Sequence, residues 1–158
     1  MRREDCDNSQ VLVALANELR HLHTVAGRNH NDLNFTNVLV CGSEDFPTTH
    51  LLDFEYAGPL DPPLDIANFF CEWMYDFGTP RWFEPDPTRF PSDEQARSFI
   101  AKYLGITNYA DDEVLAFQKE VQARIPYVHK FWIDWAMKNF SDRYEYVQYA
   151  ELRQILVD

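Results

Sequence analysis

Two short segments of this chain place carboxylates and an amide at a spacing that suits phosphoryl transfer. Residues 30–37 read HNDLNFTN, and residues 50–53 read HLLD. Transfer of a phosphoryl group from a nucleotide needs a carboxylate that orients the acceptor hydroxyl and oxygen ligands that hold Mg²⁺ against the phosphates. Asp32 is the candidate for the first role, and Asn37 and Asp53 are the candidates for the metal ligands.

The spacing has a mechanical reason, and it matches that of a kinase catalytic loop. Asp32 and Asn37 share one tight loop, so both side chains can face the same small volume. The apolar runs 38–41 and 50–52 predict a hairpin that returns Asp53 close enough to Asn37 to share a metal. The alternative is two unrelated turns, in which Asp and Asn are common. The complete pattern, H-x-D-x-x-x-x-N followed by apolar-apolar-Asp, favours the kinase loop.

Helices are predicted over most of the chain outside this hairpin, because apolar residues recur at helical spacing between capping and stop signals. The expected helices cover residues 9–26, 66–77, 92–104, 111–140 and 143–157. Asp65 should lie at or near the N-cap of the second helix, a capping box at Ser92 should open the third, and Pro126 should kink or split the fourth. The proline-bearing segments 54–64 and 78–91 are expected as loops.

These elements predict an α+β fold that is mostly helical, with one small hairpin inserted after the first helix. That is the layout of the C-terminal lobe of a protein-kinase-like fold. The 158 residues suffice for about one domain, and 46% of them are hydrophobic, so the chain can bury a core. A kinase also needs a β-rich N-terminal lobe that brings a glycine-rich phosphate cover and a lysine. The five glycines are scattered and few residues precede His30, so we expect residues 1–158 to be a single catalytic lobe with the N-terminal β lobe absent.

Charge and cysteine content limit the expected partners and compartment. A net charge of −12 and a pI of about 4.7 argue against nucleic acid and acidic lipid headgroups, and are compatible with a cationic substrate. No apolar run approaches the roughly 18 residues of a membrane span, and no signal-peptide pattern follows Met1. The cysteines Cys6, Cys41 and Cys71 are sparse and form no C-x-x-C pair, which favours the reducing cytoplasm and no zinc site.

Longer segments around the candidate residues resemble the choline/ethanolamine kinase family. They are HNDL at 30–33, LDFEYAG at 52–58, DIANFFCEWMYDF at 65–77, FWxxW at 131–135 and YxxY at 146–149. The CEWMYD string is similar to the form found in choline kinases, whereas ethanolamine-selective members differ there. The resemblance extends over nearly the whole chain, so it implies a role for individual positions.

The resemblance implies that ATP and choline react, with Mg²⁺, to give phosphocholine and ADP, the first step of phosphatidylcholine synthesis. Asp32 matches the catalytic aspartate, and Asn37 and Asp53 match the Mg²⁺ ligands. Glu55 and Glu72 match acidic positions at the site, where Glu72 would favour the substrate cation. Ethanolamine is a second substrate that the resemblance implies. Family members are often dimers, so a homodimer is compatible with it.

The resemblance also implies an aromatic pocket for the choline headgroup. Its expected members are Phe77, Trp132, Trp135 and Tyr149, with Tyr56 beside them. A quaternary ammonium has no N–H to donate, so aromatic faces recognise it, at about 0.5–2 kcal/mol each when desolvated. Trp132 and Trp135 are close enough in sequence to project from one helical face. Spacing alone favours a pair of core residues, and only the resemblance assigns the two rings to the pocket.

Other residues are expected to support the fold. His30 and Asp65 match a packed histidine and a buried aspartate that braces the catalytic loop. His23 and His129 carry no motif and are expected as ordinary surface or core residues. Three further aromatic residues are expected in packing rather than in ligand contacts: Trp73, Tyr75 and Trp82.

Two alternatives stay open on the sequence. One is a catalytically incomplete fragment that binds choline or a protein partner. The other is a different small-molecule kinase of the same superfamily, such as an aminoglycoside or sugar phosphotransferase. The CEWMYD string and the paired tryptophans argue against this second alternative.

Overall fold

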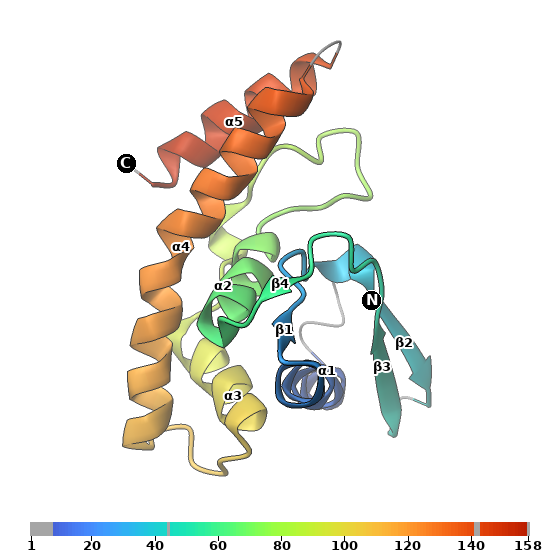
Figure 1. The fold of residues 1–158 in the computed structure, drawn as a ribbon, viewed down its shortest axis with the longest axis vertical. Helices are drawn as coiled ribbons and strands as arrows, with labels where there is room; N and C mark the ends of the chain where they lie inside the picture. The colour runs from blue at the N-terminus through green and yellow to red at the C-terminus, as the bar shows by residue number, and fades with distance from the viewer. Residues whose placement is uncertain (1–7, 44, 141–142, 158) are drawn as a thin grey trace.

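The computed structural model describes residues 8–43, 45–140 and 143–157, and helices predominate in this part of the chain. The helices are α1 (Ser9–His21), α2 (Pro62–Glu72), α3 (Asp93–Leu104), α4 (Asp112–Asn139) and α5 (Tyr144–Ile155). The strands are β1 (Arg28–Asn29), β2 (Val38–Gly42), β3 (Pro47–Leu51) and β4 (Gly58–Pro59). Figure 1 shows the long helix α4 along one side with α2 and α3 beside it, and α1 with the β2–β3 hairpin on the other. The predicted α+β, mostly helical class is confirmed.

The helical segment predicted over residues 9–26 is present, although the α-helix α1 itself ends at His21. The Asn8 side chain caps it by accepting hydrogen bonds from two backbone N–H groups of the first turn. The helix continues into a π-helical segment, Leu22–Ala26, and stops at Gly27, whose φ of 63° suits a residue without a Cβ. His23 lies in this π-helical segment, and its side chain is buried.

The predicted hairpin is present, and Asn37 and Asp53 flank its open end. Strands β2 and β3 pair antiparallel, with Val38 opposite Leu51. A hydrogen bond of 2.9 Å from Leu52 N to Asn37 O extends the pairing beyond the strands. Asp53 follows at a φ of 62°, a left-handed conformation that Asp tolerates better than most residues. The backbone just before Asp53 is therefore tied to that of Asn37.

A second, shorter strand pair was not predicted. Strands β1 and β4 pair antiparallel, with Arg28 opposite Pro59, although the sequence predicts a loop over residues 54–64. Strands of two residues are too short to show an alternating pattern, so only the pairing partner reveals them.

Helix α2 differs from its predicted bounds at both ends. It begins at Pro62, so the N-cap prediction for Asp65 is wrong and Asp61 holds the N-cap position. Proline suits the first helical turn, where its missing N–H needs no partner. The helix ends at Glu72, and the chain then turns, with Tyr75 N donating to Glu72 O at 3.2 Å. Asp65 lies inside the first turn and is fully buried.

Helices α3, α4 and α5 follow the sequence pattern except at Pro126. The predicted capping box between Ser92 and Gln95 begins α3, and Gly105, at a φ of 77°, ends it. Helix α4 runs unbroken through Pro126, so a split at this residue is wrong, and a kink stays a prediction. Pro126 is exposed, so water can hydrogen-bond the carbonyl that loses its helical partner.

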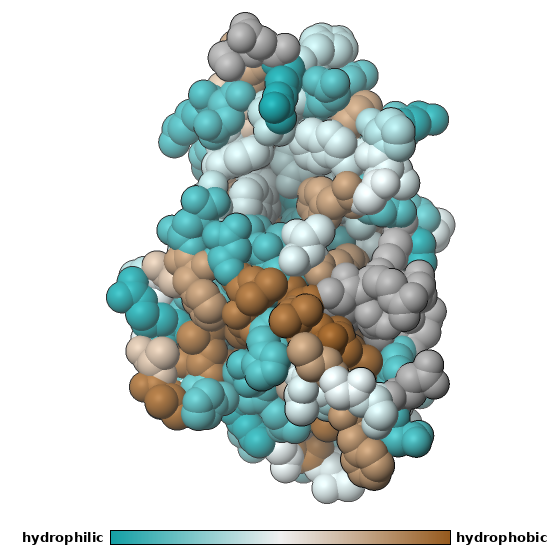
Figure 2. All heavy atoms as spheres, turned by 90° about the vertical axis from the view of Figure 1, so that its right-hand side faces the viewer, coloured by the Kyte–Doolittle hydropathy of each residue, from teal (hydrophilic) through white to brown (hydrophobic). Residues whose placement is uncertain are grey.

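The face on the side of the hairpin carries exposed hydrophobic residues. Figure 2 views this face and shows hydrophobic residues gathered across its middle. Val25, Leu39, Leu52 and Phe54 are exposed. Val25 and Phe54 also line a hollow of about 130 Å³ between the end of α1 and the hairpin. A contiguous exposed apolar surface of this kind commonly marks a contact with another structural unit.

Three observations bear on the composition-based expectations. Within the described ranges, no helix is both long and apolar enough to cross a membrane. Cys41 and Cys71 carry free thiols, and Cys6 lies outside the described residues. Over the same ranges, no group of three or more His, Cys, Asp or Glu side chains is arranged to hold a metal ion.

Candidate functional site

A buried aspartate fixes the backbone of the loop that carries Asp32. Asp65 is fully buried, and its carboxylate accepts hydrogen bonds from the backbone N–H groups of His30 at 2.6 Å and Asn31 at 2.7 Å. His23 donates a third hydrogen bond from Nε2 at 2.9 Å. Three donors compensate a carboxylate for the water that it loses on burial. The loop conformation is therefore set by helix α2 as well as by local sequence.

His30 connects this loop to the segment that precedes Asp53. Its ring is fully buried, and Nε2 donates to Leu52 O at 2.8 Å. Its Nδ1 accepts from the Asp32 N–H at 3.3 Å. Because both ring nitrogens bind backbone groups, His30 acts as a spacer between the loop and the hairpin.

The sequence carries no signal for the contacts of His23. The Nδ1 atom of His23 accepts from the Tyr103 hydroxyl at 2.7 Å, while Nε2 donates to Asp65. Tyr103 belongs to α3, so these bonds connect α3 through His23 to Asp65, which holds the loop that carries Asp32. A single histidine just beyond a helix has no motif, and only the tertiary structure reveals its partners.

Asp32 and Asn37 lie together, as their spacing predicts. Asn37 Nδ2 donates to Asp32 Oδ2 at 2.8 Å and to Asp32 O at 2.9 Å, and Asn34 Nδ2 donates to Asp32 Oδ1 at 3.1 Å. Burial raises the pKa of Asp32 from 3.8 to about 6; the two amide donors oppose this rise, and the negative charges of Glu72 and Asp53 add to it. A carboxylate with a pKa near 6 is suited to accept a proton at neutral pH.

The open end of the hairpin offers oxygen atoms that suit a divalent cation bound to phosphates. Because the amide nitrogen of Asn37 donates to Asp32, the Asn37 amide oxygen is the atom left to face a ligand. The Asp53 side chain is exposed next to the same loop. Mg²⁺ bound with nucleotide phosphates keeps several waters and takes few protein oxygens. An amide oxygen and one carboxylate therefore fit such an ion without a closed set of protein ligands.

An aromatic cavity of about 370 Å³ is lined in part by Asp32. The residues predicted for the site that line it are Asp32, Glu55, Tyr56, Glu72, Phe77, Trp132, Trp135 and Tyr149. The lining residues that the sequence did not assign to it are Asn34, Trp82, Arg143 and Tyr146. Asn37 and Asp53 do not line this cavity. Because Asn37 binds Asp32, which does line it, the candidate metal ligands and the aromatic residues form adjoining parts of one site.

Trp82 is the clearest difference from the sequence-based expectation inside this cavity. It was expected in packing alone, but its ring lines the cavity and also lies 5.5 Å, centroid to centroid, from the ring of Tyr149. Trp82 belongs to the irregular segment between α2 and α3, where prolines interrupt any periodic pattern. Without a period, the sequence cannot indicate which way a side chain points.

Hydrogen bonds hold the two indoles of α4 in place. Trp132 Nε1 donates to Asn68 Oδ1 at 2.7 Å, and Trp135 Nε1 donates to the Tyr56 hydroxyl at 2.8 Å. The two ring centroids are 5.7 Å apart, and Trp135 also contacts the Tyr146 ring at 5.3 Å. Trp132 is buried and Trp135 is half-buried, so the pair contributes to the core and to the cavity wall at once.

A buried ion pair lies behind the cavity wall. Glu72 is 2% exposed, and its Oε1 accepts a hydrogen bond from Nη2 of the fully buried Arg153 on α5. Burial raises the pKa of Glu72, and the Arg153 guanidinium opposes that rise. No motif pointed to Arg153, and the family resemblance assigned Glu72 to the substrate cation rather than to a protein partner.

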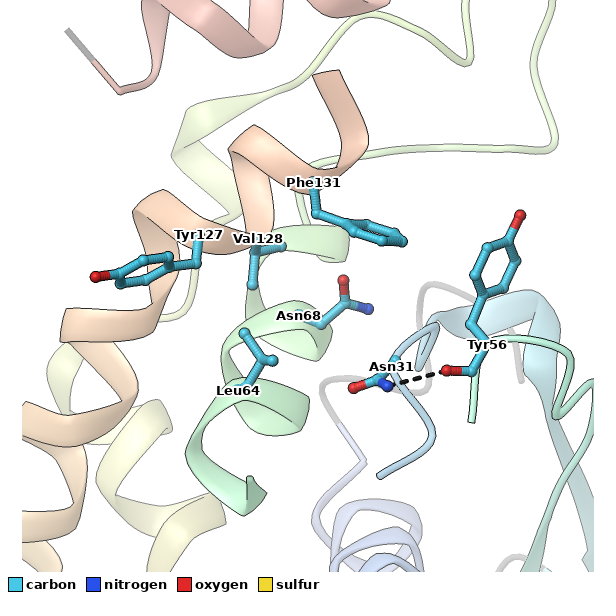
Figure 3. A pocket seen from close by; sticks show the side chains of 7 residues that line it. All are labelled: Asn31, Tyr56, Leu64, Asn68, Tyr127, Val128 and Phe131. Carbon is cyan, nitrogen blue, oxygen red and sulfur yellow. Dashed lines mark hydrogen bonds between the residues drawn. The ribbon is translucent and has the colours of Figure 1, made fainter. Parts of the chain in front are cut away.

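A second cavity, of about 340 Å³, shares Tyr56 with the first and has a different chemistry. It lies between α2, α4 and the loop that carries Asp32, and Figure 3 shows Asn31 Nδ2 donating to Tyr56 O, a bond of 2.9 Å. Its walls are Asn31, Tyr56, Leu64, Asn68, Tyr127, Val128 and Phe131. No carboxylate lines it, so the cavity beside Asp32 is the one suited to a cation.

Comparison with known proteins identifies relatives of this arrangement. The family model described as choline/ethanolamine kinase matches residues 27–156. A choline/ethanolamine kinase of Rattus norvegicus is 28% identical over an alignment of 169 residues, gaps included, and this alignment spans 92% of this chain and 42% of that protein. A probable choline kinase 1 of Arabidopsis thaliana is 31% identical over 129 residues, which cover 78% of this chain and 37% of that protein.

Solved structures show the same fold. A choline kinase from Cryptosporidium parvum superposes with a TM-score of 0.71 at 24% identity, over 98% of this chain and 46% of that chain. A Plasmodium vivax ethanolamine kinase superposes with a TM-score of 0.70 at 25% identity, over 82% of this chain and 33% of that chain. The present chain thus spans less than half the length of each of these relatives.

Proposed function

Because this chain belongs to the choline/ethanolamine kinase family, we propose that it is the catalytic lobe of an enzyme that phosphorylates choline, and ethanolamine to a lesser degree, with ATP as the phosphoryl donor. The product would be phosphocholine, and the reaction the first step of phosphatidylcholine synthesis. One arrangement carries this proposal: Asp32 lines the same cavity as Trp132, Trp135 and Tyr149. A carboxylate and aromatic faces in one cavity suit a molecule with a quaternary ammonium at one end and a hydroxyl at the other.

In the proposed mechanism the aromatic faces hold the cation, and Asp32 receives the proton of the hydroxyl that is phosphorylated. Hydrogen bonds from Asn34 and Asn37 hold the Asp32 carboxylate in position. Glu55 adds negative charge at the exposed rim of the cavity. A divalent cation, which we propose is Mg²⁺, would bind Asn37 and Asp53 and offset the charge of the nucleotide phosphates.

His30 and Asp65 have structural roles in this proposal. Asp65 anchors the loop backbone, and His30 sets the separation between the loop and the hairpin end. Precise separation matters because a small displacement of a catalytic group costs a large factor in rate.

We further propose that residues 1–158 form one lobe and that a β-rich, nucleotide-covering lobe packs against the exposed apolar face beside the hairpin. The exposure of Val25, Leu39, Leu52 and Phe54, which lie on the hairpin or on the segments next to it, supports this arrangement.

We propose that the enzyme works in the cytoplasm, with which the free thiols of Cys41 and Cys71 are compatible. We also propose that it can form a homodimer.

The proposal is tested by ADP release in a coupled assay with choline, with ethanolamine and with neither. The protein assayed is the longest in-frame product that contains this chain, because a covering lobe contributes to nucleotide binding. We expect release to depend on the added alcohol and on a divalent metal, and to be faster with choline. Equal release with and without the alcohol would contradict the proposal.

A second candidate function is choline binding without turnover. The aromatic cavity would support binding by itself, because its lining residues all belong to this chain. Choline would then quench the fluorescence of the tryptophans that line the cavity, while ADP release stayed at background. An upstream glycine-rich turn and strand lysine in the same reading frame would favour the enzyme instead.

Replacement of Trp135 by alanine will raise the choline KM about tenfold and the ethanolamine KM less. The indole is one of the faces that a methylated ammonium contacts, and such a contact contributes about 0.5–2 kcal/mol. The change also removes the hydrogen bond to the Tyr56 hydroxyl. Phe46→Ala, at an exposed aromatic residue of the hairpin turn, is the control. Equal KM increases for both alcohols would show that the cavity does not distinguish a methylated ammonium group from an unmethylated one.

The pH profile of kcat/KM will rise through about pH 6 and level off near neutrality. Burial raises the pKa of Asp32 to about 6, and only the ionised carboxylate can accept the hydroxyl proton. Asn34 donates to that carboxylate and opposes the rise in its pKa, so Asn34→Ala will move the midpoint to higher pH. A midpoint near pH 4, or one that Asn34→Ala leaves in place, would exclude Asp32 as the titrating group.

A further inference from the structure

The ion pair behind the aromatic cavity connects two helices that are far apart in sequence. Glu72 closes α2, and Arg153 lies in the last turns of α5. Both side chains are almost completely buried, at 3% and 0% exposure respectively. Removal of one partner of such a pair leaves an uncompensated charge in a site with little water.

Arg153 is also enclosed by aromatic rings. Its guanidinium carbon lies 4.5 Å from the ring centroid of Tyr75 and 4.7 Å from that of Tyr149. Its Nε and Nη1 atoms have no hydrogen-bond partner among the described residues. The electron-rich faces of the two tyrosine rings stabilise the guanidinium charge instead. Arg153 does not line the cavity, whereas Glu72 and Tyr149 do, so any influence on a ligand passes through these two residues.

The pairing changes what Glu72 can offer to a cation. A carboxylate that already accepts a hydrogen bond from a guanidinium has its charge largely balanced. The cavity then recognises an ammonium mainly through its ring faces. Ring faces suit choline, whose ammonium group has no N–H to donate. A free carboxylate would instead suit ethanolamine, whose ammonium group has three N–H donors.

We propose that Arg153 is a positioning residue that sets the preference for choline over ethanolamine by keeping the Glu72 carboxylate engaged. The inference rests on the proposed function, since it concerns the selectivity of the same cavity. It predicts that release of Glu72 from Arg153 gives ethanolamine a hydrogen-bond acceptor that choline cannot use.

The test compares the dissociation constants of choline and ethanolamine for wild type, Arg153→Met and the double variant Glu72→Gln/Arg153→Met. Quenching of tryptophan fluorescence reports binding, because Trp82, Trp132 and Trp135 line the cavity. Arg153→Met should shift the ratio of the two constants about tenfold toward ethanolamine, the effect of one charge-assisted hydrogen bond. The double variant, which has no carboxylate to release, should return the ratio to within about threefold of wild type.

Controls separate this inference from a loss of folding. Arg89→Met, at an exposed residue outside the cavity, should leave the ratio unchanged. If Arg153→Met does not fold, Arg153→Lys keeps a charge but loses the planar fork, and should shift the ratio in the same direction by about threefold. Equal weakening of both alcohols, or a double variant that keeps the ratio of the single variant, would overturn the inference.

The binding readout also separates the inference from the proposed function. If wild type prefers choline and the variants behave as stated while ADP release is absent, the inference stands and the proposed function fails. If wild type binds neither alcohol, both fail.

Discussion

Asp32→Asn will lower kcat for choline by about a thousandfold, while the dissociation constant of choline changes by less than about threefold. Loss of a general base typically costs 10²–10⁴ in rate, and the amide cannot take the hydroxyl proton. The variant keeps the shape of the side chain, and its single amide oxygen can accept from one of the two donors, Asn34 or Asn37. Turnover is measured by ADP release and binding by tryptophan fluorescence.

Asp134→Asn is the matched control for this variant, since Asp134 lies on the surface of α4 in a long contact with Lys130. It should retain full turnover. Weakened choline binding with turnover retained in Asp32→Asn would contradict the assigned role, because a proton acceptor affects the chemical step and not the affinity.

Asp32→Asn also has an expected effect on stability. The pKa of Asp32 is raised in the folded protein, chiefly by burial, so the native state binds its proton more tightly than the unfolded state. Its contribution to stability is therefore complete below pH 3.8 and is lost as the pH rises through about 6. The asparagine variant lacks this loss, so its stability relative to wild type should increase between about pH 4 and pH 7. Urea unfolding at several pH values measures the difference.

Asp65→Asn will lower the free energy of unfolding by about 3–5 kcal/mol, the usual cost of breaking a buried, fully bonded charged group. The carboxylate accepts from His23, His30 and Asn31, and an amide places a donor against at least one of these donors. Because two of the bonds hold the catalytic loop, turnover should fall as well. Urea denaturation followed by circular dichroism measures the loss of stability.

Asp61→Asn provides the comparison on the same helix. Asp61 accepts from Arg124 Nε at 2.9 Å, but both side chains are about one-third exposed. Solvent screens such a pair, so Asp61→Asn should lower the free energy of unfolding by less than about 1 kcal/mol. Similar losses for Asp61→Asn and Asp65→Asn would mean that the hydrogen bonds of Asp65 do not stabilise the loop.

The residues whose roles depend on neighbours close in sequence were predictable. The spacing of Asp32 and Asn37 sets their contact through a single loop, and the apolar runs that follow form the hairpin. Capping residues begin α1 and α3, and glycines end α3 and the π-helical segment after α1, because a cap and the turn that it closes lie within a few residues of each other.

Side-chain partnerships between distant segments were not predictable. Tyr103 binds His23, Trp132 binds Asn68 and Arg153 binds Glu72, each pair joining elements far apart along the chain. A bond of this kind leaves no periodic or local pattern in either segment. The start of α2 was missed for a related reason: Asp65 resembles a capping residue until its burial against the loop at His30 and Asn31 is known.

The amino-acid sequence thus determined the family, the contact between Asp32 and Asn37, and the members of the aromatic cavity that fall in its motifs. Tertiary structure alone decided that Trp82 reaches this cavity, that Asp65 anchors the loop from inside a helix, and that Glu72 is paired with a buried arginine. The physical reason is the range of the interactions. Capping, turns and short spacings act between neighbours in the chain, whereas burial and charge pairing depend on which distant segments the fold brings into contact.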